Sequence, residues 1–326
     1  MDAREEAVLS VENLKVAFDT DLGQAEILRG LSYRLQKGKV LAVVGESGCG
    51  KTLHALSILK LLPPGGKISQ GRILFKGKDI LSLPPEELRQ LRGGKISMIF
   101  QDPMTSLNPI RTIGKQLTET ILAHRKMSKL RAQAKALSLL KQVGIANARE
   151  RMKQYPFEFS GGQRQRIMIA MALCLHPEIL IADEPTTALD VTIQAQILKL
   201  IKKLQAKNEM AAIFITHNLA IVADVADEVL VLYGGYCVEK APVQALFASP
   251  LHPYTQGLLG SLVSVNKKQE KLPAIEGYPP VAGQELPGCP FAPRCPRATQ
   301  QCLAQLPALQ ENNGHAVRCW HWEKKV

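Results

Sequence analysis

The feature that most constrains this chain is a glycine-rich segment near residue 50. Residues Gly45–Thr52 read G-E-S-G-C-G-K-T and satisfy the pattern G-x-x-x-x-G-K-S/T. They follow the short β-branched run Val40–Val44 and precede Leu53–Leu62, where apolar residues recur at helical spacing. This order of strand, glycine loop and helix directs backbone N–H groups and a helix N-terminus at phosphate. The sequence therefore predicts a phosphate-binding loop (P-loop) in an α/β fold.

Each residue type in the P-loop has a predicted role. The glycines let the backbone wrap the phosphates, the Lys51 ammonium reaches the β- and γ-phosphates, and the Thr52 hydroxyl ligates Mg²⁺. The simpler alternative is a tight glycine turn, but the Lys-Thr pair and the flanking strand and helix argue against it. The predicted nucleotide-binding loop comprises Gly45, Glu46, Ser47, Gly48, Cys49, Gly50, Lys51 and Thr52.

A second apolar run, Ile179–Ala182, ends in the acids Asp183 and Glu184. A parallel strand that ends in two carboxylates places them at the sheet edge where ligands bind. Asp183 is then a candidate for holding Mg²⁺, and Glu184 is a candidate base for the water that attacks the γ-phosphate. Without the P-loop, a strand that ends in solvated acids would explain the pattern equally well.

Composition limits the class of protein. The chain has 326 residues, of which 46% are hydrophobic. Its 41 Lys and Arg exceed its 29 Asp and Glu. This positive charge favours anionic partners, and a solvated surface explains it equally well. No apolar stretch approaches the roughly 20 residues that cross a bilayer. Residues 1–10 are acidic and lack the apolar centre of a secretory signal, so we expect a cytosolic chain without disulfides.

The segment F-S-G-G-Q-R-Q-R, which begins at Phe159, narrows the prediction to one family. It resembles the signature motif of ABC ATPases, although Phe159 stands where that motif usually has Leu. The other landmarks of the family follow in order between residues 8 and 250. The residues that match its phosphate-facing signature and its Q-loop, D-loop and switch positions are Ser160, Gly161, Gly162, Gln163, Gln101 in F-Q-D-P, Asp190 in A-L-D, and His217 after I-F-I-T.

The resemblance implies a RecA-like P-loop core with a β-subdomain and a helical signature subdomain, the latter over residues 114–151. It implies that Gln101 approaches Mg²⁺ and the attacking water, that Asp190 communicates across a dimer, and that His217 contacts the γ-phosphate. Phe18, in L-K-V-A-F, becomes the candidate for stacking on adenine, although a strand Phe is more often core. In this family the signature of one subunit closes over the P-loop of a second, with ATP between them.

Two longer segments are similar to the peptide and nickel importer branch of the family. They are F-Q-D-P-M-T-S-L-N-P at residues 100–109 and S-P-L-H-P-Y-T-Q-G-L-L at residues 249–259, although the second read alone is a surface turn and a short helix. The match implies a D-type ATPase subunit of a di- or oligopeptide importer that binds ATP and Mg²⁺. Its partners would be an F-type ATPase subunit in a heterodimer, two transmembrane permease subunits and, indirectly, an extracytoplasmic binding protein. It would lie peripherally on the cytoplasmic face of the membrane.

Other functions remain open on the sequence. A nickel or other small-solute importer of the same branch would carry the same motifs. A soluble ABC ATPase acting on ribosomes or DNA is permitted by the basic charge, but we expect no nucleic acid because long arms between the motifs are absent. A metal or redox regulator that uses the ATPase body as a scaffold would depend on the cysteines rather than on Lys51.

The end of the chain suggests a second module. A Pro-rich stretch, residues 273–288, precedes four clustered cysteines, and we predict an ATP-binding domain over residues 1–255 and a C-terminal extension over residues 256–326. Four thiolates suit zinc or an iron–sulfur cluster, and His315 and His321 are alternative zinc ligands. The tail resembles that of peptide-importer ATPases, some of which hold a [4Fe–4S] cluster, which we predict here, with zinc or reduced thiols as alternatives. The candidate ligands are Cys289, Cys295, Cys302 and Cys319.

Overall fold

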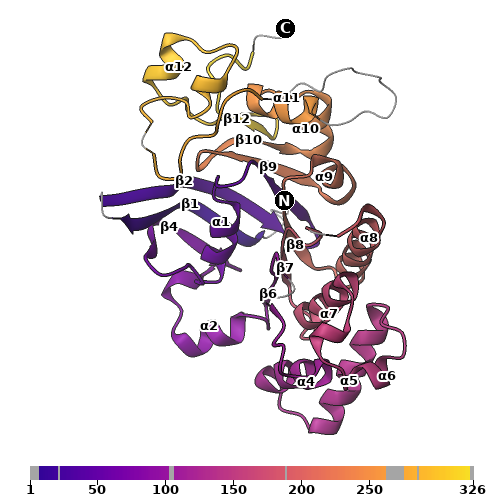
Figure 1. Cartoon of the computed structure of the whole chain (residues 1–326). Helices are drawn as coiled ribbons and strands as arrows, with labels where there is room; N and C mark the ends of the chain where they lie inside the picture. The colour runs from indigo at the N-terminus through magenta and orange to yellow at the C-terminus, as the bar shows by residue number, and fades with distance from the viewer. Residues whose placement is uncertain are drawn as a thin grey trace, which may run out of the picture. The chain divides into compact units, whose positions relative to one another are not determined.

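The computed structural model describes residues 7–20, 23–102, 106–187, 189–261, 275–284 and 286–323. These residues form two compact units, one built from residues 1–82 and 214–326 and the other from residues 83–213 (Figure 1). The division falls inside strand β8 (Ala211–Thr216), so each unit holds part of that strand. Within the described ranges, no helix combines the length and the apolar character needed to cross a bilayer.

The first unit contains an antiparallel sheet with strand order β2-β1-β4-β5. In β1 apolar side chains such as Leu9, Val11 and Leu14 are fully buried, whereas Asn13 adopts a positive φ where the register with both neighbouring strands shifts. The sheet thus combines long strands with a local irregularity at Asn13. The four strands are β1 (Ala7–Thr20), β2 (Gly23–Gln36), β4 (Gly66–Phe75) and β5 (Lys78–Asp79).

A second sheet of this unit runs in the order β11-β12-β10-β9-β3, with β8 beside β3. Strand β3 is completely buried and pairs in parallel with β9, which confirms the predicted buried strand before the P-loop. The β-branched run Val40–Val44 suits a strand covered on both faces. The strands other than β8 are β3 (Val40–Val44), β9 (Glu228–Tyr233), β10 (Tyr236–Pro242), β11 (Gln310–Asn312) and β12 (His315–Val317).

The helices of the first unit are short. Helix α1 ends at Ile58, earlier than the apolar spacing through Leu62 predicts, because Lys60 takes a positive φ and the N–H of Leu61 turns back to the carbonyl oxygen of Leu56 (2.9 Å). The helical segments of this unit are α1 (Lys51–Ile58), η1 (Ile80–Ser82), α9 (Leu219–Val225), α10 (Val243–Ala248), α11 (Pro253–Gly260), η3 (Ala292–Arg294) and α12 (Gln300–Ala304).

The second unit pairs β6 and β7 in parallel, and helix α7 contacts β6. Helices α4, α5 and α6 occupy the region predicted as helical, and Figure 1 shows them grouped beside α7. Buried Ile, Leu and Ala side chains along α4 and α5 pack this bundle. The elements are α2 (Pro85–Leu91), β6 (Ile96–Ile99), α4 (Ile113–His124), α5 (Lys129–Gln142), α6 (Ala148–Arg151), η2 (Pro156–Glu158), α7 (Gly161–Leu173), β7 (Ile179–Asp183) and α8 (Val191–Lys207).

The core of the first unit includes residues from the end of the chain. Tyr254 and Phe291 pack with Tyr233 and with the buried valines of β3 and β9 in one cluster. Tyr254 has no exposed surface, so the segment 249–259 is not the surface turn that its prolines suggest when read alone. Helix α11 in this segment packs its core residue Tyr254 against the strands β3 and β9, and β3 leads to the P-loop.

Candidate nucleotide-binding and hydrolysis site

The predicted nucleotide residues divide between the two units. The first unit holds Phe18, the P-loop and His217. The second unit holds the remaining predicted residues, which are Gln101, Ser160, Gly161, Gly162, Gln163, Asp183, Glu184 and Asp190. Residues 103–105 of the importer-like segment and residue 188 beside Asp190 lie outside the described residues.

The P-loop requires glycine at two of its positions. Gly50 adopts φ +104° as the residue before α1, and Gly45, at φ +155°, lies so close to the carbonyl of Leu232 that any Cβ would collide with it. A side chain at either position would therefore strain the loop or push it off the sheet. The glycines place the loop between the end of β3 and the start of α1, the geometry expected of an anion-binding helix N-terminus.

The Lys51 side chain is buried inside the P-loop. Its ammonium donates hydrogen bonds to the carbonyl oxygens of Gly45 (2.8 Å) and Glu46 (2.9 Å). Thr52, the next residue, is exposed in the first turn of α1. The P-loop thus holds the Lys51 ammonium on its own carbonyl oxygens and carries the Thr52 hydroxyl on the next residue. A triphosphate and its metal ion require a cation and a hydroxyl of this kind.

Phe18 and His217 lie at strand ends in the first unit. Phe18 is half-buried near the end of β1, where it pairs with Ala25 of β2 and Gly66 of β4. A Cβ on Gly66 would lie 2.8 Å from the ring, so the ring rests on the glycine. His217 is exposed immediately after β8. The adenine role of Phe18 and the γ-phosphate role of His217 remain predictions.

In the second unit, Gln101 and Glu184 meet at the carboxyl ends of β6 and β7. The Gln101 side-chain amide donates to the Glu184 carboxylate (3.2 Å), and the Thr187 hydroxyl donates to the same oxygen (2.8 Å). The two strands pair in parallel up to Ile99 and Ala182, so their ends coincide. Two donors on one oxygen orient a carboxylate that is suited to accept a proton from water.

Glu184 also departs from ordinary backbone geometry. It adopts φ +45°, a conformation that costs a non-glycine residue free energy and is common at functional sites. Asp183, which precedes it, is 2% exposed at the last position of β7. The turn after the strand thereby separates a buried carboxylate from a half-buried one, and the metal role of Asp183 and the base role of Glu184 remain predictions.

The signature residues begin helix α7. The Ser160 hydroxyl accepts from the N–H of Gln163 (3.4 Å), and the Gln163 side chain accepts from the N–H of Ser160 (3.1 Å), a reciprocal capping box. A Cβ on Gly162 would lie 2.8 Å from Ile193 of α8, which Asp190 caps by accepting from the N–H of Ile193 (2.9 Å). The predicted signature and D-loop residues therefore lie at neighbouring helix N-termini.

Sequence reasoning assigned no role to three residues that hold these segments. The buried Gln165 of α7 donates to the carbonyl of Pro185 (2.5 Å), directly after the strand acids. In the first unit, Tyr254 and Arg294 bind the P-loop residue Glu46. Gln165 lies within the signature segment and Tyr254 lies within the importer-like segment, so a motif already marked the position of each. For Arg294, the sequence offered only its place between two cysteines.

The four C-terminal cysteines line one pocket. Its wall also includes Phe291, Pro307 and His252. Burial raises the pKa of Cys289 to about 11, and burial likewise raises the pKa of Cys295 and Cys319. Among the residues that the structure describes, no group of three or more His, Cys, Asp or Glu side chains is arranged to hold a metal ion. The tertiary structure gathers the four thiols, and their ligand remains a prediction.

The chain matches two protein-family models. Residues 28–187 match the ABC transporter model, and residues 238–302 match the C-terminal region of oligopeptide/dipeptide transporters. The first match covers the P-loop, the signature and the strand acids. The second covers Tyr254, Arg294 and three of the four cysteines.

Curated relatives align over nearly the whole chain. The dipeptide transport ATP-binding protein DppD of Bacillus subtilis (strain 168) is 53% identical, with 98% of this chain and 96% of that protein covered. The oligopeptide transport ATP-binding protein OppD of Escherichia coli (strain K12) is 45% identical, with 97% and 93% covered.

Solved structures share the fold. A dimeric ATP-binding cassette in a post-hydrolysis state, bound to ADP and Pi, superposes with a TM-score of 0.65 at 25% identity and covers 72% of this chain and 98% of its own. CbiO1 of Clostridium perfringens, part of an ABC transporter complex, reaches a TM-score of 0.64 at 28% identity, with 75% and 92% covered. The P-loop, the paired Gln101 and Glu184, and full-length similarity at 53% identity lead to one conclusion: the chain belongs to the ABC transporter ATP-binding family, in its oligopeptide/dipeptide branch.

Proposed function

We propose that this chain binds and hydrolyses ATP to power an importer of di- and oligopeptides. The observation that carries the chemistry is the hydrogen-bonded set of Gln101, Glu184 and Thr187 at the ends of two parallel strands. The relatives named as dipeptide and oligopeptide transport proteins support the cargo class. An importer of nickel or another small solute in the same branch is the alternative cargo.

The hydrolysis step assigns a role to each predicted residue. The P-loop amides and Lys51 bind the β- and γ-phosphates, and Phe18 stacks on adenine. Glu184 accepts a proton from the water whose oxygen attacks the γ-phosphorus, the bond to the β–γ bridging oxygen breaks, and His217 contacts the departing phosphate. Thr52 and Asp183 would hold Mg²⁺, with Gln101 beside them, and the ion would neutralise charge at the phosphates. The buried Asp183 and the exposed Thr52 hydroxyl are oxygen ligands that suit this ion.

Partners follow from the half-sites. The chain carries one P-loop and one signature, so a second ATPase subunit would supply the facing signature to this P-loop and receive Ser160, Gly161 and Gly162 at its own. We propose an F-type subunit as that partner in a heterodimer. Two permease subunits and an extracytoplasmic binding protein complete the importer, which places this chain peripherally on the cytoplasmic face of the membrane.

We further propose that residues 256–326 form a C-terminal extension whose four cysteines hold a [4Fe–4S] cluster. The support is the arrangement of Cys289, Cys295, Cys302 and Cys319 around one pocket with few other polar groups. Four cysteine thiolates are the standard ligands of such a cluster. Iron, sulfide and zinc analysis of anaerobically purified protein tests this proposal. Four irons with matching sulfide support the cluster, and zinc without iron refutes it.

Uptake in cells tests the transport function. Cells that lack this chain are complemented with wild type or with Lys51→Ala, and the uptake of labelled dipeptides, oligopeptides and nickel is measured. Peptide uptake restored by wild type alone supports a peptide-importer ATPase. Normal peptide uptake with lost nickel uptake moves the assignment to the alternative cargo. Uptake restored equally by Lys51→Ala contradicts the ATP-driven function, and matched expression levels provide the control.

A further inference from the structure

Glu46, the second residue of the P-loop, is bound by two residues from the end of the chain. Its backbone N–H donates to the hydroxyl of Tyr254 (2.9 Å), and its carboxylate forms an ion pair with the guanidinium of Arg294 (2.7 Å). The third polar group of Glu46, its carbonyl oxygen, accepts from Lys51. Glu46 thus connects the P-loop lysine, Lys51, to α11 and to the cysteine-rich segment.

The ion pair lies in a protected position. The Arg294 side chain is 6% exposed and the Glu46 side chain is 26% exposed, so solvent screens the pair far less than it screens an ordinary surface pair. Arg294 also donates to the Tyr233 hydroxyl (3.0 Å) and to the carbonyl oxygens of Glu276 (2.9 Å) and Ile275 (3.2 Å). These bonds restrict the guanidinium to one orientation, with the carboxylate of Glu46 as its anionic partner.

The neighbourhood of the pair is tightly packed. The rings of Tyr233, Tyr254 and Phe291 lie within 5.4 Å of one another between centroids, and all three are buried. A Cβ on Gly234 would lie 2.8 Å from Pro290. Arg294 itself belongs to η3, between Cys289 and Cys295, and both cysteines bond to the backbone of Ala292 in that turn. Its position therefore depends on the fold of the four-cysteine pocket.

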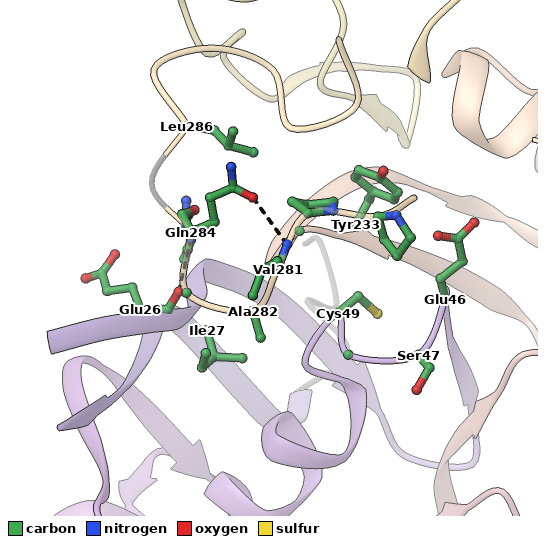
Figure 2. Close-up of a pocket in the computed structure, with 17 residues that line it drawn as sticks. Glu26, Ile27, Glu46, Ser47, Cys49, Tyr233, Val281, Ala282, Gln284 and Leu286 are labelled. Carbon is green, nitrogen blue, oxygen red and sulfur yellow. Dashed lines mark hydrogen bonds between the residues drawn. The ribbon is translucent and has the colours of Figure 1, made fainter. Parts of the chain in front are cut away.

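A second contact holds a neighbouring part of the C-terminal chain, residues 279–284 and Leu286, beside the P-loop. These residues line a hollow together with residues 46–49 and the strand β2 (Figure 2). Arg29 of β2 donates to the carbonyl of Gln284 (2.5 Å). Figure 2 shows the side chains of Glu46 and Ser47 pointing in opposite directions from the loop. Glu46 is therefore directed away from Ser47 and into the ion pair.

The charge of the Glu46 carboxylate affects phosphate binding at the P-loop. A carboxylate in a phosphate-binding loop repels a triphosphate, and a guanidinium paired with it cancels that repulsion. We propose that Arg294 and Tyr254 are positioning residues for the P-loop, and that they act through Glu46 by neutralising its carboxylate and holding its backbone so that Lys51 can engage ATP. The proposal rests on ATP binding at this P-loop and adds a role for the segments 249–259 and 289–295.

Equilibrium binding of MgATP to the purified full-length chain tests the proposal. Arg294→Met is expected to raise the Kd for MgATP about fivefold, because the Glu46 charge is left uncompensated near the phosphates. Adding Glu46→Gln to Arg294→Met is expected to return the Kd to within about twofold of wild type, because the double variant has no charge to neutralise. Rescue by the second substitution separates electrostatic positioning from a general loss of structure.

Two further variants provide controls. Arg318→Met removes an arginine of the same region that, among the described residues, donates to the carbonyls of Cys237 and Pro307 rather than to Glu46. It is expected to lower the thermal unfolding midpoint but to leave the Kd within about twofold of wild type. Arg294→Lys retains the charge with fewer donors and is expected to bind ATP more tightly than Arg294→Met. If Arg294→Met fails to fold, Arg294→Gln takes its place in the comparison with Arg294→Lys and in the double variant with Glu46→Gln.

The outcomes separate this proposal from the proposed function. If the wild-type chain binds no ATP, the proposed function fails before this inference is tested. If the wild type binds and Arg294→Met binds equally well, or if Glu46→Gln gives no rescue, the positioning role is wrong and the ATPase assignment stands. Rescue together with an unaffected Arg318→Met supports the role.

Discussion

The P-loop and the four-cysteine pocket are constructed in opposite ways. The P-loop uses eight consecutive residues and relies on backbone N–H groups that glycine makes accessible. The pocket uses side chains from four separated positions and walls contributed by α11. A substitution within the contiguous P-loop alters the site itself. A substitution near the dispersed pocket alters only residues that support the site. We therefore expect large losses from changes to the reaction chemistry and graded losses from changes to the C-terminal supports.

The largest expected effect comes from Glu184→Gln, which removes the candidate base and retains the hydrogen bonds from Gln101 and Thr187. The rate of ATP hydrolysis by the assembled transporter should fall by about 10²- to 10³-fold, because amide oxygen is a poor proton acceptor. Phosphate release measures the rate, and nucleotide binding should persist. Glu311→Gln, at an exposed carboxylate of β11, is the control. Hydrolysis at the wild-type rate would remove Glu184 from the base role.

The next prediction compares the P-loop region with the region of α11, through the pH dependence of stability that a buried histidine in each region causes. Burial lowers the pKa of His54, in the helix after the P-loop, and of His252, at the start of α11, to about 4 each. Each pKa lies below the unfolded value of about 6.5, so acidification favours the unfolded state, which takes up protons first. The free energy of unfolding should fall by about 2 kcal/mol per histidine between pH 7 and pH 5.

Urea unfolding across this pH range measures the loss. His252→Asn keeps a side-chain acceptor for the N–H of Tyr254 and removes the titrating group, so it should flatten the pH dependence by about one histidine's share. His54→Asn should do the same at the P-loop helix, where it also loses the 2.6 Å contact with Tyr33. A slope equal to that of wild type in either variant would mean that the corresponding histidine is not buried in its neutral form.

A smaller effect is expected from Phe18→Ala. Removing the candidate adenine-stacking ring should weaken ATP binding several-fold and should leave binding of inorganic triphosphate unchanged, since stacking acts only on the base. Fluorescence titration with both ligands distinguishes the two cases. Equal weakening for both ligands would indicate a structural role in β1, and no weakening would exclude Phe18 from the site.

The smallest expected effect is that of Tyr254→Phe, which deletes a single hydroxyl. The N–H of Glu46 loses its acceptor, at a cost of about 1 kcal/mol to stability, and the affinity for ATP should drop about twofold. Thermal unfolding and nucleotide titration measure the two changes. Tyr278→Phe, at a 93% exposed tyrosine, is the control. An effect larger than that of Arg294→Met would reverse the order of importance proposed for the two supports.

Local sequence was sufficient for the elements whose chemistry is contiguous. The strand Val40–Val44, the glycine loop after it and the acids that follow Ile179–Ala182 lie where their patterns predict them. The helix after the P-loop was predicted too long, because the apolar spacing through Leu62 cannot register the positive φ of Lys60 that ends it. The family assignment also followed from motifs read in order, and the comparisons confirmed it.

The remaining features depend on which residues the fold brings together. Gln101 and Glu184 share a hydrogen bond because β6 and β7 pair in parallel and end together, a register that no local pattern specifies. Arg294 reaches Glu46 across 248 positions of chain because η3 packs on the aromatic residues behind the P-loop. Sequence alone determined which groups are available for phosphate chemistry, because backbone conformation and residue type act locally. Tertiary structure alone decided which charges meet, because an ion pair depends on distance in space.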